Sequence, residues 1–291
     1  MAIKACGIVG VGLMGGSLGL ALRARGVPVA AVDESSAALN LAMKRGAADT
    51  ISAEPSILAG AELVVICTPP RSVVAAAAHA LPHLKQGCLL CDFGSIKAPI
   101  VHAIEPLLTT GVRFLGLHPM CGTAGQGMEA ARKNLFAGAV LIATPTARTE
   151  SSALEQADAL AQLLGMRLMC LSPEEHDRQV AALSHVPYLI SVALASLAPG
   201  VQCAGPAFRD ATRVAMSPPA LWEQILSMNR SHLLAAVEQL CQEIKRLGNL
   251  QGEALNNALD KARELRLSWE RIQPPASSAE AAADAKEKDQ T

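Results

Sequence analysis

The sequence predicts an α/β protein with a sheet-containing domain over residues 1–171 and an all-helical domain over residues 172–272. Short apolar runs rich in β-branched residues alternate with helix-like patterns up to residue 171, as in parallel sheets covered by helices. A glycine-rich turn follows the first run, and strand patterns stop after Ser172. Residues 273–291 are Pro, Ala, Ser and charge without apolar periodicity, so we expect a disordered tail there.

The glycine-rich turn, GVGLMG at residues 10–15, lies between a strand-like run and a helix-like pattern that ends near residue 26. Gly10 permits a tight turn, Gly12 lets backbone approach a pyrophosphate, and Gly15 lets the helix pack closely on the strand. Leu13 and Met14 of the same turn are expected to bind the cofactor, with the pyrophosphate on the free N–H groups at the start of the following helix. The unit predicts a Rossmann-like dinucleotide-binding domain.

A second strand pattern, VPVAAV at residues 27–32, ends at Asp33, 18 residues after Gly15. The acidic residue that binds the adenosine ribose lies about 20 residues beyond the fingerprint in such domains. A carboxylate would repel a 2′-phosphate, and Glu34 follows with no arginine at hand. We therefore expect NAD as the cofactor, with NADP less favoured.

Three further strand patterns end in polar loops, and in open α/β sheets such loops border the ligand crevice. Cys67, Thr68 and Pro69 follow the first and are expected cofactor neighbours, the alternative being an ordinary strand-end loop. DFGSIK at residues 92–97 follows the second. Its Ser95 can donate and accept hydrogen bonds, and its Lys97 can face an anion; the alternatives are a helix N-cap for Ser95 and a solvated charge for Lys97.

His118 ends the third of these strand patterns and is the candidate general base, because an imidazole can take a proton near neutral pH. Ser172, Pro173 and Glu175 form a predicted capping box that starts a long helix. His185 lies beside Pro187, which should kink that helix. Farther on, FRDATR at residues 208–213 contains arginines that could bind a substrate carboxylate.

Composition excludes several classes of partner. A net charge of −1 and 51% hydrophobic residues give no reason to expect nucleic acid or an anionic membrane. We expect no secretory signal, no apolar run of the roughly 18 residues that span a membrane, and a cytoplasmic location. Cys88 and Cys91 form a CxxC, but in a strand they would point to opposite faces, so no metal site is expected.

Several motifs, in this order, resemble the prephenate/arogenate (cyclohexadienyl) dehydrogenase family of tyrosine biosynthesis: GVGLMGGSLG, DFGSIK, LHPMCGT, SPEEHD, LSHVPYL and FRDATRVA. The resemblance covers roughly residues 3–250. It implies a Rossmann-like domain followed by an all-helical domain that dimerises. It also implies oxidative decarboxylation of prephenate or arogenate, to 4-hydroxyphenylpyruvate or tyrosine, with hydride passing from ring C4 to NAD.

The resemblance also implies roles for individual residues. His118 corresponds to the acceptor of the C4 hydroxyl proton, and Ser95 to its orienting partner, which also lies near the nicotinamide. His185 and Arg213 correspond to groups that hold the substrate, with Arg213 on a carboxylate. The residues by themselves do not separate Arg213 from Arg209, and nothing in the sequence decides between prephenate and arogenate or indicates feedback by tyrosine.

Two other classes fit parts of the pattern. A β-hydroxyacid dehydrogenase or imine reductase shares the domain plan, but usually places a lysine in its helical domain, and here no lysine lies between Lys133 and Lys245. A catalytically silent NAD-binding sensor would need only the nucleotide site, so the presence of His118, Ser95 and Arg213 argues against it.

Overall fold

The computed structural model describes residues 3–108, 111–123, 125–197 and 202–272, and the predicted tail at 273–291 lies outside them. One eight-stranded sheet has the order β3-β2-β1-β4-β5-β6-β7-β8. Its neighbours pair in parallel except β6 and β7, which are antiparallel. The strands are β1 Cys6–Val9, β2 Val29–Val32, β3 Thr50–Ser52, β4 Leu63–Ile66, β5 Leu89–Asp92, β6 Arg113–Pro119, β7 Val140–Thr144 and β8 Arg167–Cys170.

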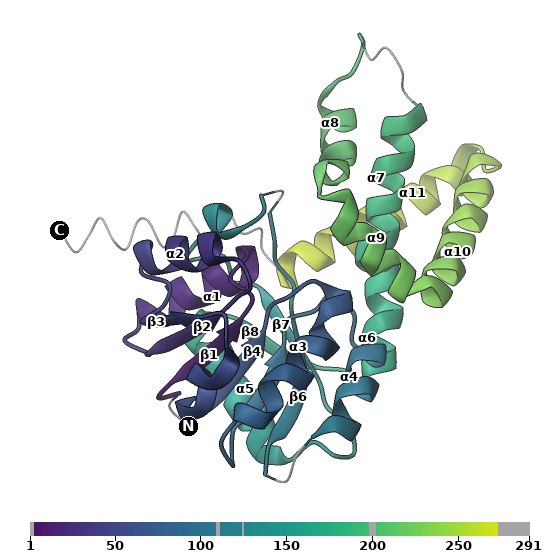
Figure 1. The fold of residues 1–291 in the computed structure, drawn as a ribbon. Coiled ribbons are helices and arrows are strands. Elements are labelled where there is room, and N and C mark those ends of the chain that lie inside the picture. Colours follow the sequence, from purple (N-terminus) through teal and green to yellow (C-terminus); the bar gives the residue numbers. More distant parts are fainter. Residues whose placement is uncertain (1–2, 109–110, 124, 198–201, 273–291) are drawn as a thin grey trace. The chain divides into compact units, whose positions relative to one another are not determined.

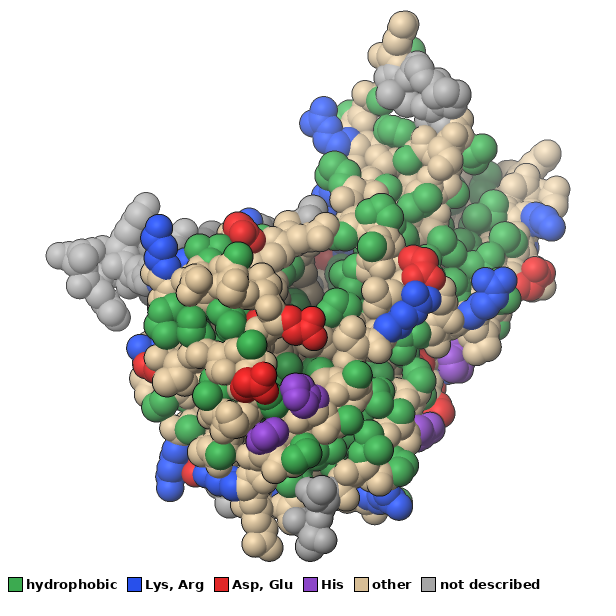
Figure 2. Space-filling model, in the orientation of Figure 1, with side chains coloured by type: hydrophobic (Ala, Val, Ile, Leu, Met, Phe, Trp, Pro, Cys, Tyr) green, Lys and Arg blue, Asp and Glu red, His purple; other side chains and the backbone are tan. Residues whose placement is uncertain are grey.

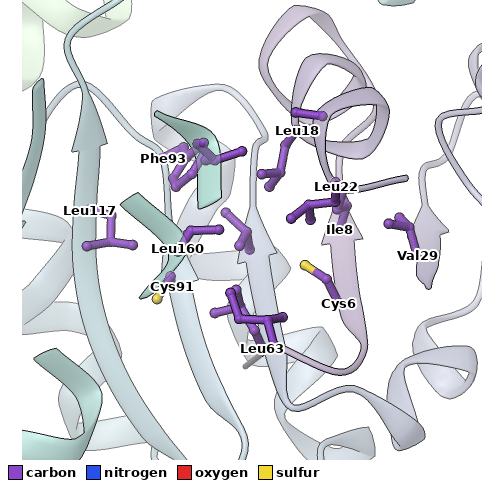
Figure 3. Close-up of a cluster of buried hydrophobic side chains, with 14 of the residues drawn as sticks. Cys6, Ile8, Leu18, Leu22, Val29, Leu63, Cys91, Phe93, Leu117 and Leu160 are labelled. Atoms are coloured by element: carbon purple, nitrogen blue, oxygen red, sulfur yellow. The ribbon is translucent and has the colours of Figure 1, made fainter. Parts of the chain in front are cut away.

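Helices cover both faces of this sheet, as Figure 1 shows. They are α1 Leu13–Arg23, α2 Ser36–Lys44, α3 Val73–Ala80, α4 Ala98–Ile104 and α5 Ser151–Leu164. Leu63 and Val65 of β4 pack with α1, α2 and α5, whereas Val64 and Ile66 pack with α3 and α4. Side chains of a strand alternate between faces, so the continuous apolar strands are those of a sheet buried on both sides. Figure 3 shows the core between the sheet and helices α1, α2 and α5, with Leu18 and Leu22 of α1 beside Ile8.

The CxxC pair follows the same alternation. Cys88 belongs to the core under α3 and α4, and Cys91 to the core under α1, α2 and α5. The prediction that the two thiols point to opposite faces is confirmed. In the described part of the chain, no cluster of three or more His, Cys, Asp or Glu side chains could hold a metal ion.

The remaining elements are helical: α6 Pro173–Val180, a π-helical turn Ala181–His185, α7 Val186–Leu197, α8 Pro206–Thr212, α9 Pro219–Met228, α10 Arg230–Gly248 and α11 Gly252–Ile272. By their contacts, Met1–Leu233 form one compact unit and Leu234–Thr291 another. Helices α6 to α9 therefore belong to the same unit as the sheet. The domain boundary near Ser172 is inferred from the end of the strand patterns, and it stays a prediction.

The start of α6 is as the sequence predicts, with one difference. Ser172 Oγ accepts the Glu175 backbone N–H at 3.1 Å, so Ser172 is the N-cap. The Glu175 carboxylate binds Arg178 and Gln179 instead of returning to the cap. Only half of the capping box forms, because the guanidinium is a stronger partner for a carboxylate than a neutral N–H.

The expected kink beside Pro187 takes the form of the π-helical turn just before it. A proline cannot donate to the carbonyl four residues earlier, and its ring crowds that carbonyl. The wider turn relieves this conflict, and it places His185 in the interior at 1% exposure.

One helical run differs from the sequence expectation. Pro173–Leu197 is long and apolar enough to cross a membrane by length and composition alone, and 33% of its most apolar window is buried within the described structure. His176, Asp177 and His185 of this run are buried. These three polar groups have hydrogen-bond partners inside the fold, as described below.

Candidate active site

The glycine turn has the geometry that a dinucleotide requires. Gly10 has φ +92°, and a Cβ there would lie 3.0 Å from the Cys67 carbonyl carbon. A Cβ on Gly15 would lie 1.9 Å from the Gly10 oxygen, so α1 packs on the turn as only glycine allows. A Cβ on Gly12 would meet nothing within 4 Å, so open space lies at the helix start, where no side chain caps the free N–H groups of Leu13 and Met14.

The loop after β4 adds a polar group to this cradle. Cys67 and Thr68 are partly exposed, Pro69 is exposed, and Cys67 N donates to Val9 O at 2.7 Å. Thr68 Oγ1 is buried without a hydrogen-bond partner among the described residues, and its methyl group lies beside Gly10. An open glycine turn, uncapped N–H groups and an unpaired hydroxyl fit the phosphates of a dinucleotide.

Asp33 lies at the end of β2 and joins the glycine turn to that strand. Its Oδ2 accepts the Val11 N–H and its Oδ1 the Ser35 N–H, each at 2.8 Å. The residue is partly exposed. Each carboxylate oxygen has a second lone pair, so the carboxylate can still accept ribose hydroxyl groups.

His118 lies at the carboxyl end of β6, next to the edge that carries the glycine turn, because β1, β4, β5 and β6 run in the same direction (Figure 1). Its Nδ1 lies 2.8 Å from Nε2 of His176, which comes from α6. The Nδ1 of His176 in turn lies 2.7 Å from Oδ1 of Asp177. His118 Nε2 makes no hydrogen bond to any other described residue, so this nitrogen is the one that can meet a ligand.

Lys97 differs from both sequence interpretations, since it is neither a solvated charge nor a free cation for a substrate anion. Its side chain is fully buried and forms an ion pair with the equally buried Asp92. Its Nζ also donates to Leu117 O at 2.9 Å. Lys97 therefore ties the end of β5 to the end of β6, one residue before His118. Burial raises the pKa of Asp92, and the ammonium group opposes that rise.

The site contains three histidines whose imidazoles are held neutral. Burial lowers the pKa of His118 well below its usual 6.5, and neighbouring His176, Lys97 and His185 lower it further. Burial also lowers the pKa of His176, against the opposing effect of Asp177. The pKa of His185 falls to about 4, again chiefly through burial. Near neutral pH each imidazole thus has one N–H donor and one acceptor nitrogen.

His185 packs near the other two histidines and is surrounded by aromatic rings and an amide. Its ring meets the edge of Trp222 at 6.1 Å between centroids, and Trp222 stacks on Tyr188 at 3.8 Å. Asn229 Nδ2 lies 3.4 Å from His185 Nδ1 and donates to Asp177 O at 2.7 Å. The helical elements thereby contribute a wall next to His118.

Two predicted site residues are not engaged with the others. Ser95 is partly exposed in the loop between β5 and α4 and makes no hydrogen bond to a described side chain. Arg213 is exposed at the start of a short turn whose Ala215 N–H donates to Ser191 Oγ on α7. Arg209 is exposed as well. Neither arginine forms an ion pair with a described carboxylate, so the predicted roles of Ser95 and Arg213 stay predictions.

Sequence reasoning missed His176, Asp177 and Asn229. The first two stand in the SPEEHD motif, but as helix residues after a strong N-cap they carried no signal of their own. Their burial, at 0% and 2% exposure, is what marks them.

A glycine turn shaped for a pyrophosphate and a neutral histidine on one sheet edge define a dinucleotide-dependent dehydrogenase. Comparison with known proteins gives the family. The model of the prephenate dehydrogenase nucleotide-binding domain matches residues 18–170, and that of the prephenate dehydrogenase dimerization domain matches residues 172–261. The chain belongs to the prephenate dehydrogenase family.

Individual relatives agree with this assignment. The chain is 30% identical over 256 residues to cyclohexadienyl dehydrogenase of Zymomonas mobilis, covering 84% of this chain and 87% of that one. The structure of prephenate dehydrogenase from A. aeolicus with hydroxyphenyl propionate and NAD+ is 27% identical, with a TM-score of 0.84 and coverage of 92% and 99%. Synechocystis arogenate dehydrogenase is 29% identical, with a TM-score of 0.79 and coverage of 91% and 99%. The hydroxyacid dehydrogenase and sensor alternatives are not favoured.

Proposed function

We propose that this protein oxidatively decarboxylates prephenate or arogenate with NAD, releasing carbon dioxide and 4-hydroxyphenylpyruvate or tyrosine. The observation that carries the proposal is the neutral His118 at the carboxyl end of β6, with Nδ1 bound to His176 and Nε2 free of described partners. Nicotinamide, when bound, supplies the hydride acceptor. The protein's own task is to orient the ring and handle one proton.

His118 Nε2 accepts the proton of the ring C4 hydroxyl as that carbon loses hydride and its C–O bond gains carbonyl character. The ring carboxylate then leaves as carbon dioxide, and its bonding electrons complete the aromatic ring and reach the C4 oxygen. That oxygen takes a proton and becomes the phenol of the product. Aromatisation drives the sequence, so a single well-placed base suffices.

Other side chains are proposed to hold the two reactants. Ser95, at the same edge, orients His118 and the nicotinamide through its hydroxyl. His185 lines the substrate side, and Arg213 binds a carboxylate through its guanidinium fork. Support for these roles is the position of Ser95 in the loop after β5 and of His185 near His118, and for Arg213 the FRDATRVA motif.

Gly10, Gly12, Leu13, Met14 and Gly15 are proposed to hold the pyrophosphate, with Cys67, Thr68 and Pro69 alongside. Asp33 is proposed to select NAD over NADP, since a carboxylate accepts ribose hydroxyls and repels a 2′-phosphate.

We infer that the protein is a homodimer, formed through the predicted helical domain at residues 172–272. Helices α10 and α11 expose five large apolar side chains: Leu234 54%, Ile244 58%, Leu259 55%, Leu265 62% and Trp269 50%. Hydrophobic side chains reach the surface of the helical elements in Figure 2. Such a surface is typical of an interface between subunits. For a biosynthetic dehydrogenase of this kind we expect a cytoplasmic location.

The test follows the absorbance of reduced cofactor with purified protein, NAD or NADP, and prephenate or arogenate. Turnover with NAD and at least one substrate is the expected result, and the faster substrate defines the specificity. No turnover in any of the four pairs, with NAD binding intact, would overturn the proposal.

A further inference from the structure

A chain of hydrogen bonds runs from the start of α4 to the proposed base. The backbone N–H groups of Lys97 and Ala98 donate to Oδ1 and Oδ2 of Asp177 at 2.8 and 2.9 Å. Asp177 Oδ1 also lies 2.7 Å from His176 Nδ1. His176 Nε2 lies 2.8 Å from His118 Nδ1. All of these groups belong to one compact unit, so the chain of contacts is a property of that unit.

The acceptor character of a carboxylate fixes the direction of every bond in this chain. An ionised Asp177 has no proton to give, so His176 Nδ1 must be the donor. A neutral His176 then has its lone pair on Nε2, and that nitrogen must accept from His118 Nδ1–H. A neutral His118 is left with its lone pair on Nε2, the nitrogen without a described partner. The tautomer of the base is therefore set from Asp177.

We propose that His176 and Asp177 are positioning residues, which hold His118 in the tautomer and ring orientation that expose a proton-accepting Nε2. This inference rests on the proposed function, in which His118 accepts the substrate proton. Once His118 is protonated, the Asp177 carboxylate, which is two hydrogen bonds away through His176, also stabilises the imidazolium. Removing Asp177 would therefore affect both the resting tautomer and the charged state.

The surroundings of Asp177 are built to keep it in place. Its backbone carbonyl accepts the Asn229 amide at 2.7 Å, and its side chain is 2% exposed. The groups that face His118 are His176 from α6, His185 from the π-helical turn, and Lys97 from the loop before α4, paired with Asp92 at the end of β5. Lys97 opposes a positive charge on His118, whereas Asp177 favours a positive charge on His176, the hydrogen-bond partner of His118.

A purely structural role is the competing explanation, because Asp177 also joins α6 to α4. NMR of protein with isotope-labelled histidine nitrogens separates the two, since it reports which ring nitrogen carries the proton. The His118 signal is assigned by its loss in His118→Asn. Wild-type protein should show His118 protonated on Nδ1, and a proton on Nε2 instead would overturn the inference whatever the variants do.

Steady-state kinetics of variants provide a second test of the positioning role. Asp177→Asn can present an N–H to His176 and reverse both bonds, so kcat should fall by about 10²-fold or more with KM values little changed. The matched control is Glu174→Gln, an exposed carboxylate on the same helix, which should keep the wild-type kcat. His176→Gln retains an acceptor for His118 Nδ1 and should keep more activity than His176→Leu. Equal kcat in Asp177→Asn and wild type would overturn the inference.

The outcomes distinguish this inference from the proposed function. A wild-type protein inactive on both substrates, but with His118 protonated on Nδ1, would refute the function and leave the tautomer assignment standing. An active wild type with the opposite tautomer would refute only the positioning role. If Asp177→Asn fails to fold, the wild-type NMR spectrum and the comparison of His176→Gln with His176→Leu still test the inference.

Discussion

At the residue scale, the site depends on the state of one imidazole. His118→Asn should leave NAD binding nearly unchanged and lower turnover by about 10²-fold or more, since the amide cannot take up the substrate proton. Steady-state kinetics and NAD titration measure the two effects. The exposed His102→Asn is the matched control. Normal turnover in His118→Asn would remove this residue from the mechanism.

Asp33 gives a second prediction at this scale. Asp33→Ser should lower the ratio of kcat/KM for NAD to that for NADP by about tenfold or more, since a ribose contact and a repulsive charge are both lost. The neighbouring Glu34→Gln tests whether any nearby negative charge produces the preference for NAD, and it should leave the ratio close to wild type. An unchanged ratio in Asp33→Ser would contradict the ribose assignment.

At the element scale, the strand-turn-helix unit makes different demands on its glycines. Gly15→Ala places a methyl group against the Gly10 carbonyl, and we expect destabilisation of about 1–3 kcal/mol or more together with loss of NAD binding. Gly12→Ala meets open space, and its unfolding free energy should change by less than about 1 kcal/mol. Its NAD affinity should nevertheless fall, because the methyl group occupies the cofactor's approach.

Chemical denaturation and NAD titration of both glycine variants check this contrast. Equal loss of stability in the two variants would show that the turn tolerates neither methyl group. Wild-type NAD affinity in Gly12→Ala would place the pyrophosphate elsewhere.

The link between β5 and β6 is a buried ion pair, and its energetics predict a large effect of breaking it. Lys97→Met leaves the Asp92 carboxylate buried without its cation, which should cost about 3–5 kcal/mol of stability. The double variant Lys97→Met, Asp92→Asn should recover part of that loss. Denaturation of the four-member cycle measures the coupling, and additive losses would mean that the pair is not coupled.

Local patterns in the sequence predicted the elements better than the contacts between them. The glycine turn and Asp33 could be found in the sequence because dinucleotide-binding domains place these residue types at a fixed spacing along the chain. The pairing of His118 with His176 could not, because the two lie 58 residues apart and meet only through the packing of α6 on the sheet domain. Lys97 stands in a polar loop sequence, so nothing local indicated its complete burial.

At the scale of the whole molecule, the buried neutral histidines couple folding to pH. His176 and His185 have folded-state pKa values below the 6.5 of an exposed imidazole. Above pH 6.5 neither state binds these protons, so stability does not depend on them. Below 6.5 the unfolded chain takes up protons that the folded protein refuses, and stability falls as pH falls. For His185 this continues to its pKa of about 4.

The expected slope is up to about 1.4 kcal/mol per pH unit for each such histidine. Urea denaturation at a series of pH values measures it. His185→Gln should flatten the profile between pH 6.5 and about 4, whereas the exposed His79→Gln should leave it unchanged. An identical profile in His185→Gln would show that His185 is protonated as readily when folded as when unfolded.

The contact between His118 and the pair His176–Asp177 crosses the junction of the two family models, at residues 170 and 172. Hybrid genes that join the front of one relative to the back of another would separate these partners. Such chimaeras should retain nucleotide affinity yet work only when the incoming segment brings its own imidazole and carboxylate. The junction is thus a poor place for recombination, although it falls in an exposed stretch between a strand and a helix.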